Sequence, residues 1–206
     1  MGEFFARLSV RRDAGPIDSV ESVAEFVSTR ASFVAQKTLY GYLKTRMGTR
    51  YPSLFEDDVF VRSIDIAKFE IFAACLSDLS IFASARSLPR ACDATLQCAL
   101  ARKFFQGGIG DNADMAPEEF SAAKAISRFE ERLAGTDWGG PAGERGNFTE
   151  SPKALFDWAP IAPQLKQQDA DIVRNSINFA WSEVRQTFER RLDARAIETE
   201  IDLPVP

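Results

Sequence analysis

Basic residues that could bind an anion are concentrated in one short stretch of the sequence. Arg30, Lys37 and Lys44 follow one another at intervals of seven residues, and no acidic residue lies between Arg30 and Arg50. Seven residues are close to two turns of an α-helix, so these three side chains, called the basic strip below, share one helix face. Guanidinium and ammonium groups in such a row are typical of surfaces that bind carboxylates or phosphates.

Polar and aromatic side chains extend this candidate binding surface toward the end of the same stretch. One hypothesis is that the surface binds an acidic partner. The alternative is a solvated helix face whose carboxylate neighbours come from the acidic last helix. The residues assigned to the candidate surface are Arg30, Gln36, Lys37, Tyr40, Tyr42, Lys44, Arg46, Arg50 and Tyr51.

The composition of the 206-residue chain excludes several kinds of catalytic site. It contains no histidine, which excludes Ser-His-Asp and Cys-His systems, histidine zinc sites and the Glu-x-x-His di-iron site. Cys75, Cys92 and Cys98 are too few for a four-cysteine metal site or a disulfide framework, and they predict a reducing, cytoplasmic location. A single Ser-x-x-Lys match, Ser121 with Lys124, is interpreted as part of a helix surface. We therefore predict no catalytic residue, metal site or cofactor.

The charge pattern also limits the partners that we expect. A formal net charge of -5 opposes nonspecific binding to phosphate backbones, so a nucleic acid is not expected as a partner. The first twelve residues combine Phe4, Phe5 and Leu8 with basic side chains, and contact with an anionic membrane is one interpretation of them beside simple local packing. The most apolar stretch, 64–85, contains too many charged residues for a transmembrane helix.

Hydrophobic periodicity predicts an all-α, single-domain bundle of about five main helices. The second of them is apolar on several sides and is expected to be the central helix. We expect residues 1–17 to form a loosely ordered N-terminal segment, and the glycine-rich stretch 134–150 to form a long mobile loop. The helices are predicted over 19–47, 58–87, 89–105, 116–133 and 163–198, with a short helical turn over 151–158.

Two segments resemble an uncharacterised family of bacterial all-helical proteins. They are RASFVAQKTLYGYLKTRMGTRYPSLFEDDVF, from Arg30 to Phe60, and AACLSDLSIFA, from Ala73 to Ala83. Some members of that family carry an esterase label. The resemblance covers about a quarter of the chain and implies a bacterial, cytoplasmic protein, but it supplies no catalytic residues.

Two functional hypotheses follow from these patterns. The first is a non-enzymatic interaction or adaptor protein that binds an acidic protein partner through the candidate surface. The second is a small-molecule binding protein, or an esterase-like hydrolase with a non-histidine site, with its pocket between the first two helices. Such a pocket would hold an acyl or apolar anionic ligand and would take its polar groups from Lys37, Tyr40, Tyr42 and Arg50. The oligomeric state is left open.

Overall fold

The computed structural model describes residues 15–51, 53–89, 92–138 and 148–201. Within these ranges the chain forms α-helices and no strand, which confirms the all-α class, although seven helices replace the five main ones expected. None of the described helices is long and apolar enough to cross a membrane. The helices are α2 (Val20–Met47), α3 (Asp58–Ser87), α4 (Ala94–Gly110), α5 (Ala122–Ala134), α6 (Glu150–Trp158), α7 (Pro163–Arg191) and α8 (Ala194–Glu200), with 3-10 turns η1 (Gly48–Arg50), η2 (Ser53–Glu56) and η3 (Ala113–Met115).

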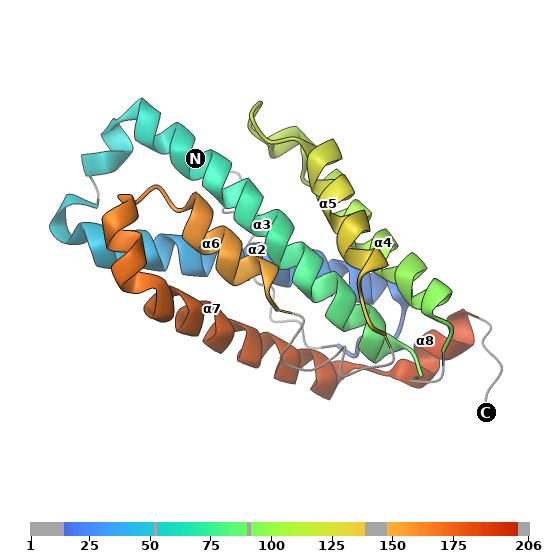
Figure 1. Ribbon diagram of the computed structural model, residues 1–206. Coiled ribbons are helices and arrows are strands. Elements are labelled where there is room, and N and C mark those ends of the chain that lie inside the picture. Colours follow the sequence, from blue (N-terminus) through green and yellow to red (C-terminus); the bar gives the residue numbers. More distant parts are fainter. Residues whose placement is uncertain (1–14, 52, 90–91, 139–147, 202–206) are drawn as a thin grey trace.

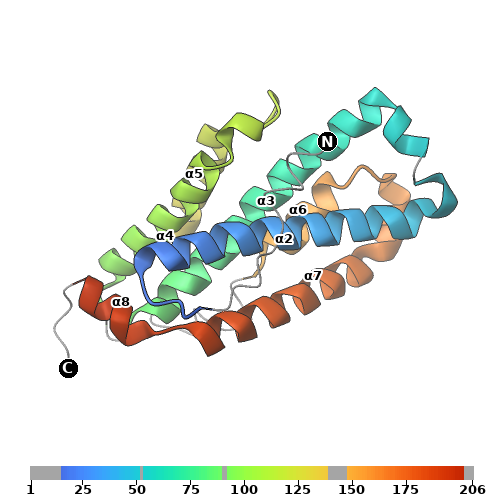
Figure 2. The ribbon, with the colours of Figure 1, turned by 180° about the vertical axis from the view of Figure 1, so that it is seen from behind.

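The central position expected for the second long helix is confirmed, because α3 packs against α2, α4 and α6. Figure 1 shows α4 and α5 on one side of α3 and α6 and α7 on the other, and in Figure 2, which is seen from behind, α2 crosses in front. Helices α2 and α3 begin and end within one residue of their predicted bounds. Asp57 caps α3 by accepting hydrogen bonds from the backbone N–H groups of Val59 and Phe60.

The predicted starts of the third and fourth helices, at 89 and 116, are wrong. The predicted starts lie at Pro89 and next to Pro117, because proline is common in the first turn of a helix. The helices begin five or six residues later, behind side chains that cap them. Asp93 caps α4 by accepting from the N–H of Thr95, and Ser121 caps α5 by accepting from the N–H of Lys124. The Ser-x-x-Lys match is therefore part of a helix cap.

Helix α4 also extends beyond its predicted end at 105, through Gly107 and Gly108, as far as Gly110. Gly108 lies against α3, and a Cβ atom added there would sit 2.8 Å from the methyl carbons of Leu76. Glycine at this position therefore allows α3 and α4 to approach closely.

The predicted last helix, 163–198, is two helices, because the segment before α2 inserts at the break between α7 and α8. The N–H of Ile17 donates to the Arg191 carbonyl, and the N–H of Asp193 donates to the Ile17 carbonyl, both at 2.8 Å. Ile17 is buried, so the segment expected to be loosely ordered is packed at this point. Residues 1–14 of that segment and 139–147 of the expected loop lie outside the described residues.

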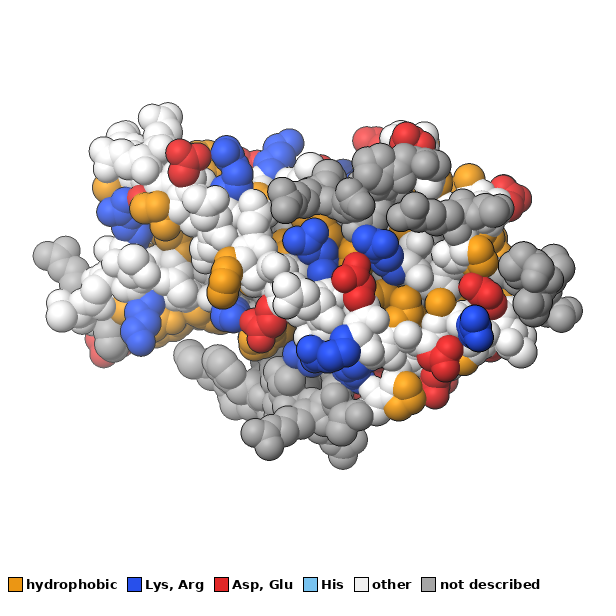
Figure 3. Space-filling view, turned by 90° about the horizontal axis from the view of Figure 1, so that it is seen from below, with side chains coloured by type: hydrophobic (Ala, Val, Ile, Leu, Met, Phe, Trp, Pro, Cys, Tyr) orange, Lys and Arg blue, Asp and Glu red, His pale blue; other side chains and the backbone are white. Residues whose placement is uncertain are grey.

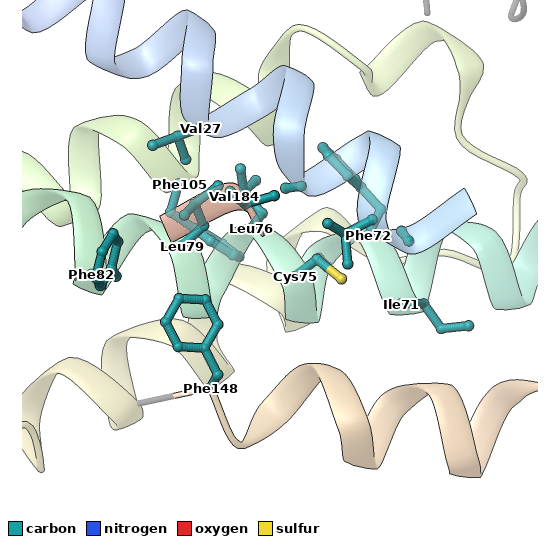
Figure 4. Close-up of a cluster of buried hydrophobic side chains, with 14 of the residues drawn as sticks. Val27, Ile71, Phe72, Cys75, Leu76, Leu79, Phe82, Phe105, Phe148 and Val184 are labelled. Atoms are coloured by element: carbon teal, nitrogen blue, oxygen red, sulfur yellow. The ribbon is translucent and has the colours of Figure 1, made fainter. Parts of the chain in front are cut away.

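An aromatic cluster closes the core where α3, α6 and α7 meet. The ring of Phe82 lies 5.5 Å from that of Phe148 and 5.7 Å from that of Phe188, and Phe148 also contacts Trp181 at 4.8 Å. In Figure 4, Phe148 rises from the segment before α6 toward Leu79 on α3. One end of the glycine-rich stretch is thus anchored in the core.

We predict that Phe82→Ala lowers the free energy of unfolding by about 3–5 kcal/mol, because it removes a fully buried ring that touches two others. Urea denaturation measures the change. Val59→Ala is the matched control on the same helix, and since Val59 is exposed it should change stability by less than about 0.5 kcal/mol. Equal effects of the two changes would contradict the central position of α3.

Candidate functional site

The basic strip lies on α2, but its members have different surroundings. Lys37 pairs with Glu183 of α7 at 3.7 Å, and both side chains are well exposed. Arg30 lies over the ring of Phe26, 5.5 Å from its centre, and Lys44 is exposed. Glu183 thus supplies Lys37 with a carboxylate from the last long helix, as the alternative interpretation of the strip expects. Binding of an acidic partner here stays a prediction.

Two further residues of the candidate surface bind α7. The hydroxyl of Tyr42 donates to a carboxylate oxygen of Asp169 at 2.9 Å, and the guanidinium of Arg46 binds both oxygens of the same carboxylate. Asp169 is buried. The hydrogen bonds from Arg46 lower the pKa of Asp169, whereas burial and the nearby carboxylate raise the pKa of Tyr42 to about 12. These three side chains join the end of α2 to the start of α7.

The remaining residues of the candidate surface are divided between the other side of α2 and the turn that follows it. Tyr40 is half-buried, and burial, together with the charge of nearby Asp65 on α3, raises its pKa. Tyr51 packs edge-on against Phe55 at 5.1 Å. Gln36 lines a narrow gap between α2 and α3. Arg50 ends η1, and its side chain is outside the described part of the structure.

The structure contains a large open cleft that the sequence did not indicate. It has a volume of about 510 Å3 and is lined mainly by residues of α3, α5 and α6. Its floor is made by small α3 side chains, Ala73, Ala74 and Ser77. A volume of this size lies within the range of small-molecule binding sites.

A buried polar network lies beneath one end of the cleft. Asp78 of α3 has no exposed surface, and the guanidinium of Arg132, from α5, reaches its carboxylate at 2.7 Å. From α6, Ser151 donates its backbone N–H at 2.8 Å and its hydroxyl at 2.5 Å. The Ser151 hydroxyl in turn accepts a hydrogen bond from the indole N–H of Trp181 on α7, at 2.8 Å. Burial raises the pKa of Asp78, and its contacts with Arg132 and Ser151 offset part of that rise.

The walls of the cleft carry charges of both signs beside aromatic rings. Phe105 of α4 and Phe129 of α5 stack at 4.1 Å and close the cleft on one side. Trp158 stands at the end of α6 and is partly exposed. The charged side chains that line the cleft are Glu70, Arg128, Glu131, Arg132, Glu150, Lys153 and Asp157.

Some of these lining charges are already matched inside the protein. Arg128 donates to Glu70 at 2.8 Å, and Arg132 binds Asp78 and also donates to the hydroxyl of Ser77 at 2.8 Å. Ser77 supplies the one hydroxyl among the described lining residues, and its hydrogen-bonding partner is a cation, which cannot act as a general base. The arrangement is suited to binding a polar molecule, and the bond to Arg132 does not activate the Ser77 hydroxyl as a nucleophile.

Sequence reasoning missed this site because its parts lie far apart in the chain. A carboxylate inside the apolar run of α3 was the one available signal, since a buried Asp requires partners. The sequence cannot identify those partners, Arg132 and Ser151, which follow Asp78 by more than fifty residues.

No family model, curated protein or solved structure matches the chain. The resemblance to esterase-labelled helical proteins therefore stays a prediction. Among the residues that the structure describes, no group of three or more Cys, Asp or Glu side chains is arranged to hold a metal ion.

We predict that Asp169→Asn destabilises the fold at neutral pH and that this loss shrinks in acid. The folded pKa of Asp169 is lowered from the unfolded value of about 3.9, so its ionised form stabilises the fold above about pH 4. That contribution disappears as the pH falls through the lowered folded pKa. Urea denaturation of wild type and variant over this pH range measures the effect.

Asp171→Asn is the matched control on the same helix, because the Asp171 side chain is mostly solvent-exposed and its ion pair with Arg174 spans 3.3 Å. It should leave stability nearly unchanged at every pH. A loss for Asp169→Asn that stays constant from neutral to acid pH would contradict the assigned role of its charge.

Proposed function

We propose that the protein is a non-enzymatic binding protein that holds a small amphipathic molecule in the cleft between α3, α5 and α6. The observation that carries the proposal is one open cavity of about 510 Å3 that combines a small-residue floor, aromatic walls and fixed charges. This cleft takes the place of the pocket between the first two helices that the sequence suggested for a ligand.

Pre-organisation supports binding at this site. Arg132 is held at the inner end of the cleft by Asp78 and Ser77, so ordering this side chain for a ligand costs little entropy. The stacked rings of Phe105 and Phe129 are buried within the bundle and form a rigid apolar wall. A binding site that is already formed needs no rearrangement of the helices.

The distribution of charge favours a ligand that carries both signs. Lys153 would attract an anionic group, with further N–H donors from the paired Arg128 and Arg132, whereas Glu131, Glu150 and Asp157 would attract a cationic one. A ligand with one sign alone would also meet like charges in the same cleft. A zwitterion with an apolar body, of the size of an aromatic amino acid, satisfies both the charges and the aromatic walls.

Catalysis is less well supported than binding. Ser151, the hydroxyl closest to a carboxylate, is fully buried, and its oxygen already donates to Asp78 and accepts from Trp181. A nucleophile must reach its substrate, and this hydroxyl has no access to the cleft. An esterase-like activity would need other groups.

We predict that L-phenylalanine binds the wild-type protein more tightly than phenethylamine or 3-phenylpropanoate, which each keep the ring but lose one charge. Isothermal titration calorimetry, supported by NMR shifts of cleft residues, measures the three affinities. Equal affinities would contradict the two-sign argument, and no binding of any probe would contradict the choice of ligand size and shape.

Filling the cleft provides the matched variant. Ala74→Trp places an indole on the floor and should weaken phenylalanine binding by at least about tenfold. Ala123→Trp adds the same side chain at an exposed position of α5 outside the cleft and should leave binding unchanged. If both variants bind like wild type, the ligand site lies elsewhere.

A further inference from the structure

An apolar stripe runs along the outer face of α7, away from the cleft. Leu165, Ile172 and Phe179 are 39%, 64% and 75% exposed, and they follow one another at intervals of seven residues. Among the described residues, two other large hydrophobic side chains are comparably exposed, and neither lies on α7. Figure 3 views the side on which α7 lies in Figure 1, and hydrophobic side chains are visible there among polar ones.

The stripe is separate from the face that α7 uses inside the bundle. Val173, Ile177 and Trp181 point inward and are buried. The stripe residues recur with the heptad spacing by which one helix packs along another, over about 21 Å at 1.5 Å per residue. Exposed large side chains that align in this way indicate an interaction surface rather than isolated surface residues.

The residues one turn away from the stripe carry no unmatched charge. The uncharged ones are Gln168, Asn175, Ser176 and Ser182. The two carboxylates in this set are engaged within the protein, Asp169 by Arg46 and Tyr42 and Glu183 by Lys37. Covering the stripe would therefore bury apolar surface without leaving an unpaired charge, as in the core of a protein interface.

We propose that this stripe binds the same stripe of a second copy of the chain, forming a two-fold dimer through α7. A two-fold interface requires a patch that is complementary to itself. The stripe meets this requirement because Leu165 and Phe179 are equally far from Ile172. In an antiparallel pair with Ile172 at the axis, Leu165 packs on Phe179 of the partner subunit, and the flanking Asn175 and Ser176 lie close to the axis.

The properties of the stripe also set the strength of the dimer. The exposed carboxylates nearest the stripe, Asp171 and Glu183, already pair with Arg174 and Lys37, so a strongly charged partner would have to compete with these pairs. A single helix face of about 21 Å is smaller than the surface that a permanent dimer buries, so association should be weak and depend on concentration.

Sedimentation velocity from about 5 μM to about 500 μM tests the proposal. The wild-type mass should rise from that of the 22.9 kDa monomer toward twice that value. Ile172→Glu should remain monomeric over the whole range. Val59→Glu is the matched control, because Val59 is as exposed as the stripe but lies on α3, and this variant should associate like wild type.

A mixing experiment tests whether Ile172 lies at the axis. Ile172→Glu and Ile172→Lys should each be monomeric alone, and an equimolar mixture should associate because the opposite charges then face each other. Circular dichroism verifies that each variant is folded, and Phe179→Ser, at another exposed position, provides an independent break in the stripe. A wild type that stays monomeric, or an Ile172→Glu variant that associates like wild type, would overturn the proposal. A mixture that remains monomeric would overturn the axis at Ile172.

Discussion

The burial of one carboxylate, that of Asp78, constrains the arrangement of four helices. A charge with no exposed surface costs several kcal/mol unless partners surround it. Its helix, α3, supplies none of the polar groups described around the carboxylate, and they come instead from Arg132 on α5 and from Glu150 and Ser151 on α6. Trp181 on α7 joins through Ser151. The helices that form the walls of the cleft are thus tied to the helix that forms its floor.

This constraint explains how a cleft persists in a small helical bundle. Apolar packing alone would favour closing α5 and α6 together over the small side chains of α3, because closure would remove apolar surface from water. Arg132 must instead reach Asp78 from one side, and Ser151 must reach it from the other. Contacts farther along α5 fix its outer side, including the ion pair of Glu130 with Arg102 at 2.6 Å. The cleft is therefore a consequence of satisfying a buried charge.

Local signals in the sequence were sufficient for the overall architecture and for helices α2 and α3. Their starts agree with the structure because the hydrophobic periodicity begins directly behind a capping side chain, Ser19 for α2 and Asp57 for α3. The errors arise where two local signals compete or where a distant segment intervenes. Helix α4 was predicted to begin at Pro89 but begins behind Asp93, and the break before α8 depends on Ile17, which lies far away in sequence.

The candidate site was less predictable than the fold, for the same reason. Spacing correctly placed Arg30, Lys37 and Lys44 on one helix, and the alternative interpretation expected carboxylates from the last helix, but the sequence could not identify Glu183 and Asp169 as those that bind Lys37 and Arg46. The last helix was expected to have a heavily charged outer face, whereas Ile172 and Phe179 make part of that face apolar. Pairings between residues more than a hundred positions apart are decided by tertiary packing, and hydrophobic periodicity in the sequence does not indicate them.

Native-state hydrogen exchange on Asp78→Asn tests most directly whether this carboxylate holds the walls of the cleft. The substitution keeps the shape of the side chain and removes its charge. We expect backbone amides of α5 and α6 to lose about 1–3 kcal/mol of protection, and those of α2 to lose clearly less. Asp65→Asn, on the same helix but outside the network, should leave both groups unchanged. If the Asp78→Asn variant loses protection equally in all helices, or loses none in α5 and α6, this role of Asp78 is contradicted.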